Sequence, residues 1–275
     1  MVHDREDRRV SRRRLITGIG TLSLGGLLTA GDPSFGVTLT DDPSTAFDPG
    51  THAKADALFA KARTCRLAPS TMQGPYYFET GAIRSDLRED REGVRLRLAI
   101  KVQDGATCRP LPRAVVEIWH CDAAGLYSGA ESESRDALKD RGEDGKAQIN
   151  PDTKFADMRP TDRKRYLRGV QIADTGGVVR FTTIWPGWYP GRTVHIHAMV
   201  VVDDRRALCT ELMFDESLNK KVLSRPPYLG HDQARDTHNG NDPVFKDDML
   251  AHVVQDGDGY LAVIVVATDP DLRQV

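Results

Sequence analysis

The chain lacks several features that would assign it to a common class of protein. Its formal net charge is only −2, from 38 basic and 40 acidic residues, so we expect no nucleic-acid partner and no anionic membrane surface. None of its four cysteines stands in a Cys-x-x-Cys pair, which argues against a zinc ribbon or a thioredoxin-type site. The composition is that of a globular protein, and 275 residues predict one large domain, or one domain with tails.

No apolar run near the start is long enough for a comfortable membrane span, which takes about 20 residues. The run at 15–30 is rich in glycine and follows five arginines between Arg8 and Arg14. This order is typical of an export signal, and SRRRLI at 11–16 resembles the twin-arginine signature. We therefore expect residues 1–31 to direct export through the twin-arginine route to the periplasm, cell surface or medium. A disordered basic tail and an uncleaved anchor are the alternatives.

The rest of the chain is expected to form a linker and a short helix (32–63), a main domain (64–268) and a tail (269–275). Alternation of apolar and polar residues predicts a half-buried strand at 94–102, where Val94, Leu96, Leu98, Ile100 and Val102 share one face. Further strands are expected at 114–120, 177–185, 194–202, 209–215 and 260–268. The fold class is therefore predicted to be all-β, an antiparallel β-sandwich with long loops and a few short helices.

The stretch PGWYPGRTVHIH, 186–197, carries the strongest indication of chemistry. Side chains at i and i+2 of a strand share a face, so His195 and His197 project together, while the apolar opposite face can fill the core. Two imidazoles on one face suit zinc, copper, iron or nickel. A pair that only hydrogen-bonds its neighbours is the alternative.

The residues near this pair favour ferric iron over zinc or ferrous iron. No aspartate or glutamate adjoins the H-x-H pair, although ferrous two-histidine sites and zinc hydrolases want a carboxylate. Tyr189 lies in the turn before the strand instead. Its phenol has an ordinary pKa near 10, but a bound trivalent cation favours the hard phenolate donor. A plain surface-turn tyrosine is the alternative.

Three segments together resemble the intradiol ring-cleavage dioxygenases, which include the catechol, hydroxyquinol and protocatechuate dioxygenases. They are GPYY (74–77), AVVEIWHCDAAGLYSG (114–129) and YLRGVQIADTGGVVRFTTIWPGWYPGRTVHIH (166–197). The resemblance implies a β-sandwich with non-haem Fe(III) held by two tyrosines and two histidines. At the matching positions stand Tyr127, Tyr189, His195 and His197, with Arg192 at the position of the family's arginine.

The resemblance also implies an enzyme that cleaves a small aromatic diol with O2 between its two hydroxylated carbons, giving a muconate-type dicarboxylate. Tyr189 would accept a substrate proton, and Arg192 would stabilise negative charge on the ring. His120 is interpreted as structural. An exported, non-enzymatic β-sandwich binding module is the alternative function. The substrate, the oligomeric state and the roles of loops 130–166 and 216–246 stay open.

The cysteines leave their own alternatives open. In an oxidising compartment Cys65, Cys108, Cys121 and Cys209 could form one or two disulfides, and three full pairings are possible. A fully reduced set is the other interpretation, because Cys121 falls in an apolar, strand-like segment.

Overall fold

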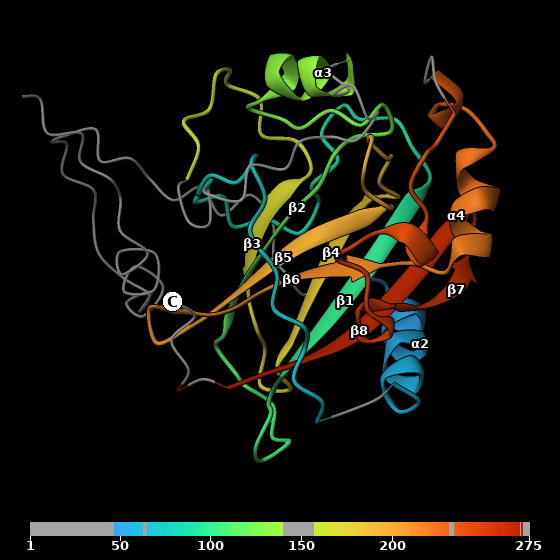
Figure 1. The fold of residues 1–275 in the computed structure, drawn as a ribbon. Coiled ribbons are helices and arrows are strands. Elements are labelled where there is room, and N and C mark those ends of the chain that lie inside the picture. Colours follow the sequence, from blue (N-terminus) through green and yellow to red (C-terminus); the bar gives the residue numbers. More distant parts are fainter. Residues whose placement is uncertain (1–46, 63–64, 140–156, 231–233, 270, 272–275) are drawn as a thin grey trace, which may run out of the picture.

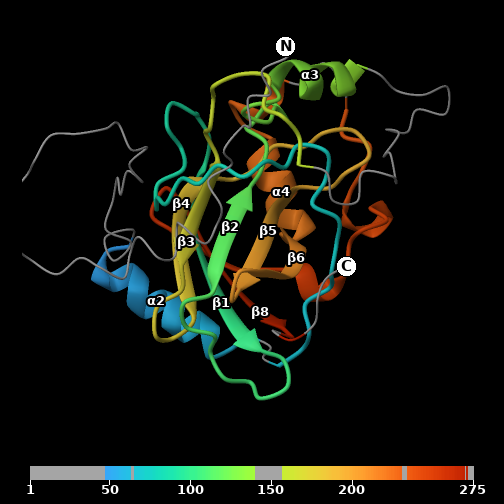
Figure 2. The same ribbon diagram turned by 90° about the vertical axis from the view of Figure 1, so that its left-hand side faces the viewer.

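The computed structural model describes residues 47–62, 65–139, 157–230, 234–269 and 271, so the expected signal at 1–31 lies outside the described part. Two four-stranded sheets form a sandwich, in the strand orders β4-β1-β8-β7 and β3-β2-β5-β6 (Figure 1). Figure 2 turns the second sheet toward the viewer. The strands are β1 (Arg95–Asp104), β2 (Val115–Trp119), β3 (Arg168–Ile172), β4 (Val178–Ile184), β5 (His195–Val202), β6 (Arg205–Met213), β7 (His252–Asp256) and β8 (Gly259–Thr268).

The prediction of a β-sandwich is confirmed, with two differences in detail. β3 and β7 were not predicted, because β3 is short and β7 is mostly half-exposed, so neither carries a clear alternating pattern. The sheets are also not wholly antiparallel, since β1 and β8 pair in parallel from Leu96 opposite Tyr260 to Asp104 opposite Thr268. The alternation of apolar and polar residues gives no information on strand direction, so it could not predict that β1 and β8 pair in parallel.

The core lies between the two sheets and is made by one face of each strand. The predicted inward face of β1 is buried there, and so is the apolar face of β5. Because β5 supplies the core with this face alone, its other face is free to carry polar groups on the outside of the β3-β2-β5-β6 sheet. The inward residues of the two strands are Leu96, Leu98, Ile100, Val102, Ile196, Ala198 and Val200.

The helices lie outside the sandwich, and the first covers one of its outer faces. α2 (Pro49–Phe59) packs Ala55 and Phe59 on the outer face of the β4-β1-β8-β7 sheet (Figure 1). It starts earlier than the periodicity at 52–63 indicated, because Asp48 caps it by accepting a hydrogen bond from the Thr51 backbone N–H at 2.9 Å.

Two more helices lie within the predicted loops. α3 (Glu131–Lys139) lies beyond one end of the sandwich, within the loop predicted at 130–166. α4 (Glu216–Leu223) lies within the second loop, predicted at 216–246. Three single turns complete the description: η2 (Tyr228–Gly230), η3 (Asn239–Asn241) and η4 (Asp247–Met249). Within the described residues, no helix has the length and apolar character that crossing a membrane requires.

The cysteines divide into one pair and two single residues. A disulfide joins Cys65, just after α2, to Cys108 in the turn between β1 and β2. Cys121 and Cys209 are buried and form no disulfide. The sequence left open one or two disulfides or a fully reduced set, and one disulfide is formed.

Candidate metal centre

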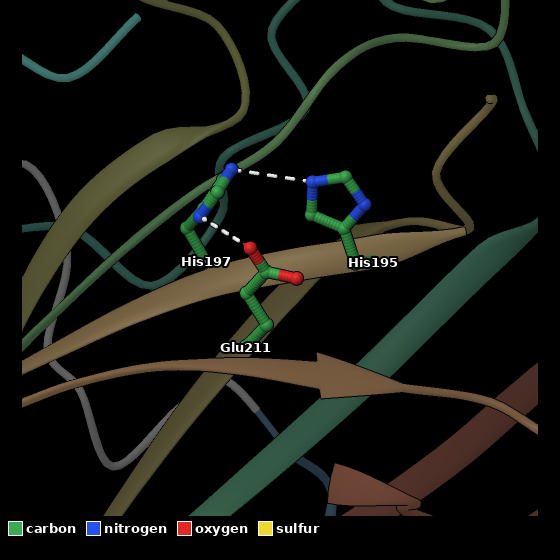
Figure 3. Close-up of side chains that lie close together, drawn as sticks. All are labelled: His195, His197 and Glu211. Carbon is green, nitrogen blue, oxygen red and sulfur yellow. Dashed lines mark hydrogen bonds and ion pairs between the residues drawn. The ribbon is translucent and has the colours of Figure 1, made fainter. Parts of the chain in front are cut away.

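The outer face of β5 carries both histidines of the H-x-H motif. His195 and His197 are each 2% exposed, although this face points away from the sandwich core. The two Nε2 atoms lie 3.2 Å apart (Figure 3). His195 Nδ1 lies 2.7 Å from the Thr193 carbonyl and donates to it, which leaves the Nε2 lone pair available. The predicted pair of convergent imidazoles is therefore present.

Tyr189 approaches the same point from the turn before β5. Its hydroxyl oxygen lies 3.0 Å from His195 Nε2. The turn closes through a bridge between Tyr189 and Arg192 and includes Gly191 at φ +81°, a left-handed conformation that favours glycine. This turn aims the phenol inward, so Tyr189 is not a plain surface residue.

Tyr127 reaches the centre from the loop between β2 and α3. Asp122 folds this loop by accepting hydrogen bonds from the backbone N–H groups of Ala124 and Leu126, both at 2.9 Å. The Tyr127 backbone N–H donates to Ser134 Oγ in α3 at 3.1 Å. The Tyr127 ring then lies edge-on to the Tyr189 ring, with centroids 5.9 Å apart. Its hydroxyl is buried without a hydrogen-bond partner of good geometry.

The GPYY segment and β2 form the walls of this centre. Tyr76 packs against Tyr127, with ring centroids 4.8 Å apart. Gly74 comes so close to His197 that a Cβ atom at this position would lie 3.1 Å from the imidazole Cε1. Trp119 stacks on the same imidazole. The segments quoted for the family resemblance therefore meet at one place, although they are distant in the chain.

The four donor groups are in their neutral forms in the absence of a cation. Burial lowers the pKa of both His195 and His197, which keeps the imidazoles uncharged. Burial also raises the pKa of Tyr127 well above its ordinary value, and the neighbouring Tyr189 adds to this shift. Burial likewise raises the pKa of Tyr189, and the charge of Arg192 opposes this shift. Phenolates at this centre therefore need a cation nearby.

Arg192 is buried beside the donors and is not a solvated turn residue. It is 6% exposed, its Nη2 contacts Glu211 Oε2, and its Nε lies 3.1 Å from Asp242 Oδ2. Burial opposes the guanidinium charge, but the carboxylates outweigh burial and raise the pKa of Arg192. A permanently charged guanidinium is thus fixed next to the tyrosine–histidine cluster.

The expectation that no carboxylate lies beside the H-x-H pair was wrong. Glu211 on β6 stands directly opposite His197 in the antiparallel register, and its Oε1 lies 3.6 Å from His197 Nδ1 (Figure 3). His195, His197 and Glu211 form a compact group of potential metal ligands. However, Glu211 approaches the ring nitrogen that faces away from His195, so it lies behind the imidazole and outside the Tyr–His–His convergence.

Sequence reasoning missed Glu211 because it considered only neighbours along the chain. The available signal was the mainly apolar 207–214 segment, in which a single acidic residue interrupts a buried strand. Its side chain shares a face with Cys209 and Met213 by the period of two. Pairing of consecutive strands by a hairpin would have placed this residue next to β5.

His120 belongs to the structural framework, as expected. It is fully buried, with Nδ1 2.8 Å from the Cys121 carbonyl and Nε2 2.7 Å from Thr183 Oγ1. Thr183 lies on β4, in the other sheet, so the imidazole links the two layers. Both ring nitrogens are engaged, and His120 has no role among the convergent donors.

Fold and site together define a β-sandwich protein with a buried cluster of two tyrosines and two histidines on one outer sheet face. Among solved structures, an intradiol ring-cleavage dioxygenase from Tetranychus urticae is 30% identical, with 76% of this chain and 98% of that chain covered and a TM-score of 0.66. A second dioxygenase structure is 32% identical, with 76% and 97% covered and a TM-score of 0.66. The chain belongs to the intradiol ring-cleavage dioxygenase family.

Curated relatives are matched over shorter stretches. A catechol 1,2-dioxygenase of Pseudomonas sp. (strain EST1001) is 33% identical over 119 residues, which is 42% of this chain and 35% of that protein. A catechol 1,2-dioxygenase of Acinetobacter baylyi is 26% identical over 250 residues, which is 81% of this chain and 68% of that protein. The chain spans 35% of the Pseudomonas sp. (strain EST1001) protein, and it spans 56 and 59% of two chlorocatechol 1,2-dioxygenases, from Rhodococcus opacus and Pseudomonas sp. (strain P51). No family model matches the chain.

Proposed function

We propose that the protein is an intradiol ring-cleavage dioxygenase that opens a catechol-type ring with O2 between its two hydroxylated carbons, giving a muconate-type dicarboxylate. The observation that carries this proposal is the convergence of three donor atoms from one short segment. Tyr189 Oη lies 3.0 Å from His195 Nε2, and that nitrogen lies 3.2 Å from His197 Nε2. The Tyr127 hydroxyl completes the set from a different loop.

The donor set suits non-haem Fe(III). The buried Tyr127 hydroxyl lacks a protein partner of good geometry, and a buried polar atom of this kind is costly unless something binds it. Two phenols and two neutral imidazoles offer two hard oxygen donors and two nitrogen donors, and a trivalent cation would offset the raised pKa values of the phenols. We therefore propose that Tyr127, Tyr189, His195 and His197 hold the ion.

A zinc hydrolase is less well supported, even though a carboxylate is now known to be close. Glu211 contacts Arg192 and faces His197 Nδ1, so it is not directed at the position where the donor atoms meet. A general base has to reach that position.

Bound iron would supply a Lewis acid and a template for the diol and O2. The chain's own groups would then act on the substrate's protons and charge. Tyr189 Oη, when ionised, can accept a proton from a substrate hydroxyl, because the turn before β5 aims it at the donor cluster, 3.0 Å from His195 Nε2. Arg192, fixed by two carboxylates, presents a positive charge to an oxyanion without needing to move. A fixed charge of this kind typically contributes a few kcal/mol to transition-state stabilisation.

The surrounding side chains would exclude water from the reacting groups. Trp119 and Tyr127 are each 1% exposed, and both histidines are 2% exposed. Electrostatic interactions at the centre are therefore weakly screened, which strengthens the effect of Arg192.

We also propose that the main domain at 64–268 is the catalytic domain and that the protein is exported through the twin-arginine route. The Cys65–Cys108 disulfide supports the second proposal, because disulfides form and persist mainly in oxidising compartments. A fusion of residues 1–46 to a reporter that is active only outside the cytoplasm would test it, with Arg12→Lys/Arg13→Lys as the control that abolishes export.

The proposed reaction is tested by loading purified protein with ferric iron and recording its absorption spectrum, oxygen uptake and product with catechol. We expect a visible tyrosinate-to-iron charge-transfer band, one O2 consumed per catechol, and a ring-opened dicarboxylate. Metal analysis on the isolated protein separates this function from the alternatives. A colourless protein that carries zinc, or that binds no metal and consumes no oxygen after iron is added, would overturn the proposal.

A further inference from the structure

Arg168 stands at one end of a row of side chains that crosses the outer face of the β3-β2-β5-β6 sheet. The antiparallel registers place Arg168 opposite Trp119, and Trp119 opposite His197. Glu211 ends the row on the other side of His197. Directly opposite residues in a sheet share a face. Since Arg168 is 1% exposed, the row places a buried guanidinium on the face that carries the donor cluster.

The partners of this guanidinium among the described residues are neutral oxygen atoms. Its Nη2 donates to the Tyr76 carbonyl at 2.7 Å and to the Ser128 carbonyl at 2.9 Å, and its Nε donates to Ser128 Oγ at 3.0 Å. Its Nη1 is buried without a hydrogen-bond partner. Buried arginines are usually paired with a carboxylate, as Arg192 is with Glu211. Arg168 is therefore a buried cation held by dipoles alone.

The Arg168 side chain keeps its charge although it is buried. Burial lowers its pKa to about 10, and the charge of an ionised Tyr127 is the largest effect that opposes this shift. The charges of Glu117 and Arg165 act on the same pKa in opposite directions, so they partly offset each other. A positive charge thus remains beside the donor cluster at neutral pH.

The same guanidinium contacts both segments that frame the Tyr127 ring. Ser128 directly follows Tyr127, and Tyr76 packs its ring on Tyr127 with centroids 4.8 Å apart. The Cζ atom of Arg168 lies 4.2 Å from the centroid of the Phe78 ring and 5.9 Å from that of Tyr127. One side chain therefore fixes the surroundings of this phenol and places a positive charge beside its ring.

The two phenols of the donor cluster have different electrostatic surroundings for this reason. Beside Tyr189 the cation is Arg192, and its charge is shared with the carboxylates of Glu211 and Asp242. Beside Tyr127 the charge of Arg168 is not shared in this way. Of the two phenolates that the metal would bind, Tyr127 is the one with a cation at its disposal.

We propose that Arg168 is a positioning residue for Tyr127, which clamps the phenol and compensates the negative charge that Tyr127 carries when it binds the metal. The inference rests on the proposed function. A cation beside a phenolate stabilises the electrons of that ligand. The charge-transfer transition moves an electron from the ring beside the guanidinium toward the donor cluster, so the positive charge should raise the energy of the band.

The test records the visible spectra of iron-loaded wild type and Arg168→Gln. Glutamine can still donate to a backbone carbonyl but carries no charge. We expect the band to shift to longer wavelength by roughly 10 nm or more, because the ligand electrons lose a stabilising charge in a weakly screened site. Iron affinity is a poorer readout, since a cation stabilises the phenolate and also repels Fe(III).

Two further variants separate the charge from the packing. Arg168→Lys keeps the charge but has fewer donors in a different geometry, so it should restore most of the wild-type band position. A side chain that acts through packing alone would shift the band equally in the lysine and glutamine variants. In a Tyr127→Phe background, Arg168→Gln should shift the remaining band much less, because the ligand beside the guanidinium is gone.

Arg206→Gln is the matched control. Arg206 lies on β6 of the same sheet, with its Cζ atom 5.2 Å from the centroid of the Tyr77 ring. It pairs with Asp157 at 3.1 Å, and Tyr77 is not one of the proposed ligands. The same loss of a cation next to a phenol should therefore leave the band within roughly 3 nm of its wild-type position.

Arg168→Met, which also lacks the charge, is the second variant should Arg168→Gln fail to fold. A band that stays in place or shifts to shorter wavelength in a folded uncharged variant overturns the proposal, as do equal shifts in Arg168→Gln and Arg168→Lys. Loss of the fold in both uncharged variants also overturns it, because the charge would then serve the framework. A wild-type band without oxygen uptake on catechol overturns the proposed reaction alone, and the shift still decides the role of Arg168. Wild-type protein that gains no band with iron overturns both proposals.

Discussion

Trp119 lies flat against His197, with ring centroids 5.1 Å apart and an angle of 6° between the ring planes. The two residues stand directly opposite each other on β2 and β5, so the sheet register itself creates the stack. Tyr77 packs on Trp119 in turn, at 4.6 Å between centroids. The imidazole therefore cannot rotate about its ring torsion without displacing a buried indole.

Removing this stack should loosen His197 as well as the sheet. Trp119→Ala is expected to lower the free energy of unfolding by about 3–5 kcal/mol, the usual cost of deleting a buried large aromatic residue. Trp119→Phe keeps an aromatic face and should cost less. Both changes should weaken iron binding, and Trp119→Ala should weaken it more than Trp119→Phe. Competition with a chelator, at a temperature where each variant is folded, measures the affinities. Iron affinity equal to that of the wild type in folded Trp119→Ala would contradict an orienting role.

Gly74 is expected to tolerate no side chain. It has φ +74°, and an added Cβ would meet His197 Cε1 at 3.1 Å. Gly74→Ala should therefore cost about 1–3 kcal/mol of unfolding free energy from backbone strain alone, and it should displace the imidazole and reduce iron affinity. Gly240→Ala is the control, since nothing lies within 4 Å of a Cβ at that position. Chemical denaturation and chelator competition on both variants measure the two effects.

Much of this centre could be predicted because its residues follow strand periodicity. The alternation in 194–202 separates a core face from the face that carries His195 and His197, and the structure has both. The turn chemistry of PGWYPG similarly places Tyr189 just before the strand. These are local properties, in which the period of two and the demands of a tight turn decide where a side chain points.

The remainder depended on contacts between distant segments. Glu211 reaches the centre through the pairing of β5 with β6, and Gly74 through a segment that crosses the outer face of the sheet. The parallel pairing of β1 with β8 joins strands near opposite ends of the domain. Register and strand order are set by the total packing of both sheets, so no window of the sequence carries them.

Acid should destabilise the iron-free protein partly through His120. Burial lowers the pKa of His120 to about 4, from an ordinary value of 6.5. The unfolded chain therefore binds one more proton than the native state between these two values, and stability falls as the pH drops from about 6.5 to about 4. The loss from this group approaches about 3 kcal/mol. This loss of stability is complete below the pKa of His120 in the native state and absent above its pKa in the unfolded chain.

His120→Gln isolates this contribution from those of the other buried histidines. The variant is expected to be less stable at neutral pH, because the glutamine cannot reproduce both hydrogen bonds of the imidazole. Its stability should nevertheless fall less steeply between pH 6.5 and 4, by up to about 1.4 kcal/mol per pH unit. Urea denaturation across this range measures both slopes. Parallel slopes for the two proteins would show that His120 takes up its proton without unfolding.

Tyr127→Phe should separate metal binding from folding. The Tyr127 hydroxyl is buried without a hydrogen-bond partner of good geometry, so its removal deletes an unsatisfied polar atom and leaves the ring packing on Tyr76 intact. We expect the iron-free variant to be as stable as the wild type, or more stable by up to about 1 kcal/mol, while the charge-transfer band weakens or shifts and iron affinity falls.

Tyr77→Phe is the contrast, because the Tyr77 hydroxyl donates to buried Glu117 at 2.9 Å. Its loss should cost about 1–3 kcal/mol of stability and leave the band in place. Iron-free Tyr127→Phe that is clearly less stable than the wild type would mean that the hydroxyl has a structural partner, and an unchanged spectrum would remove Tyr127 from the proposed ligands.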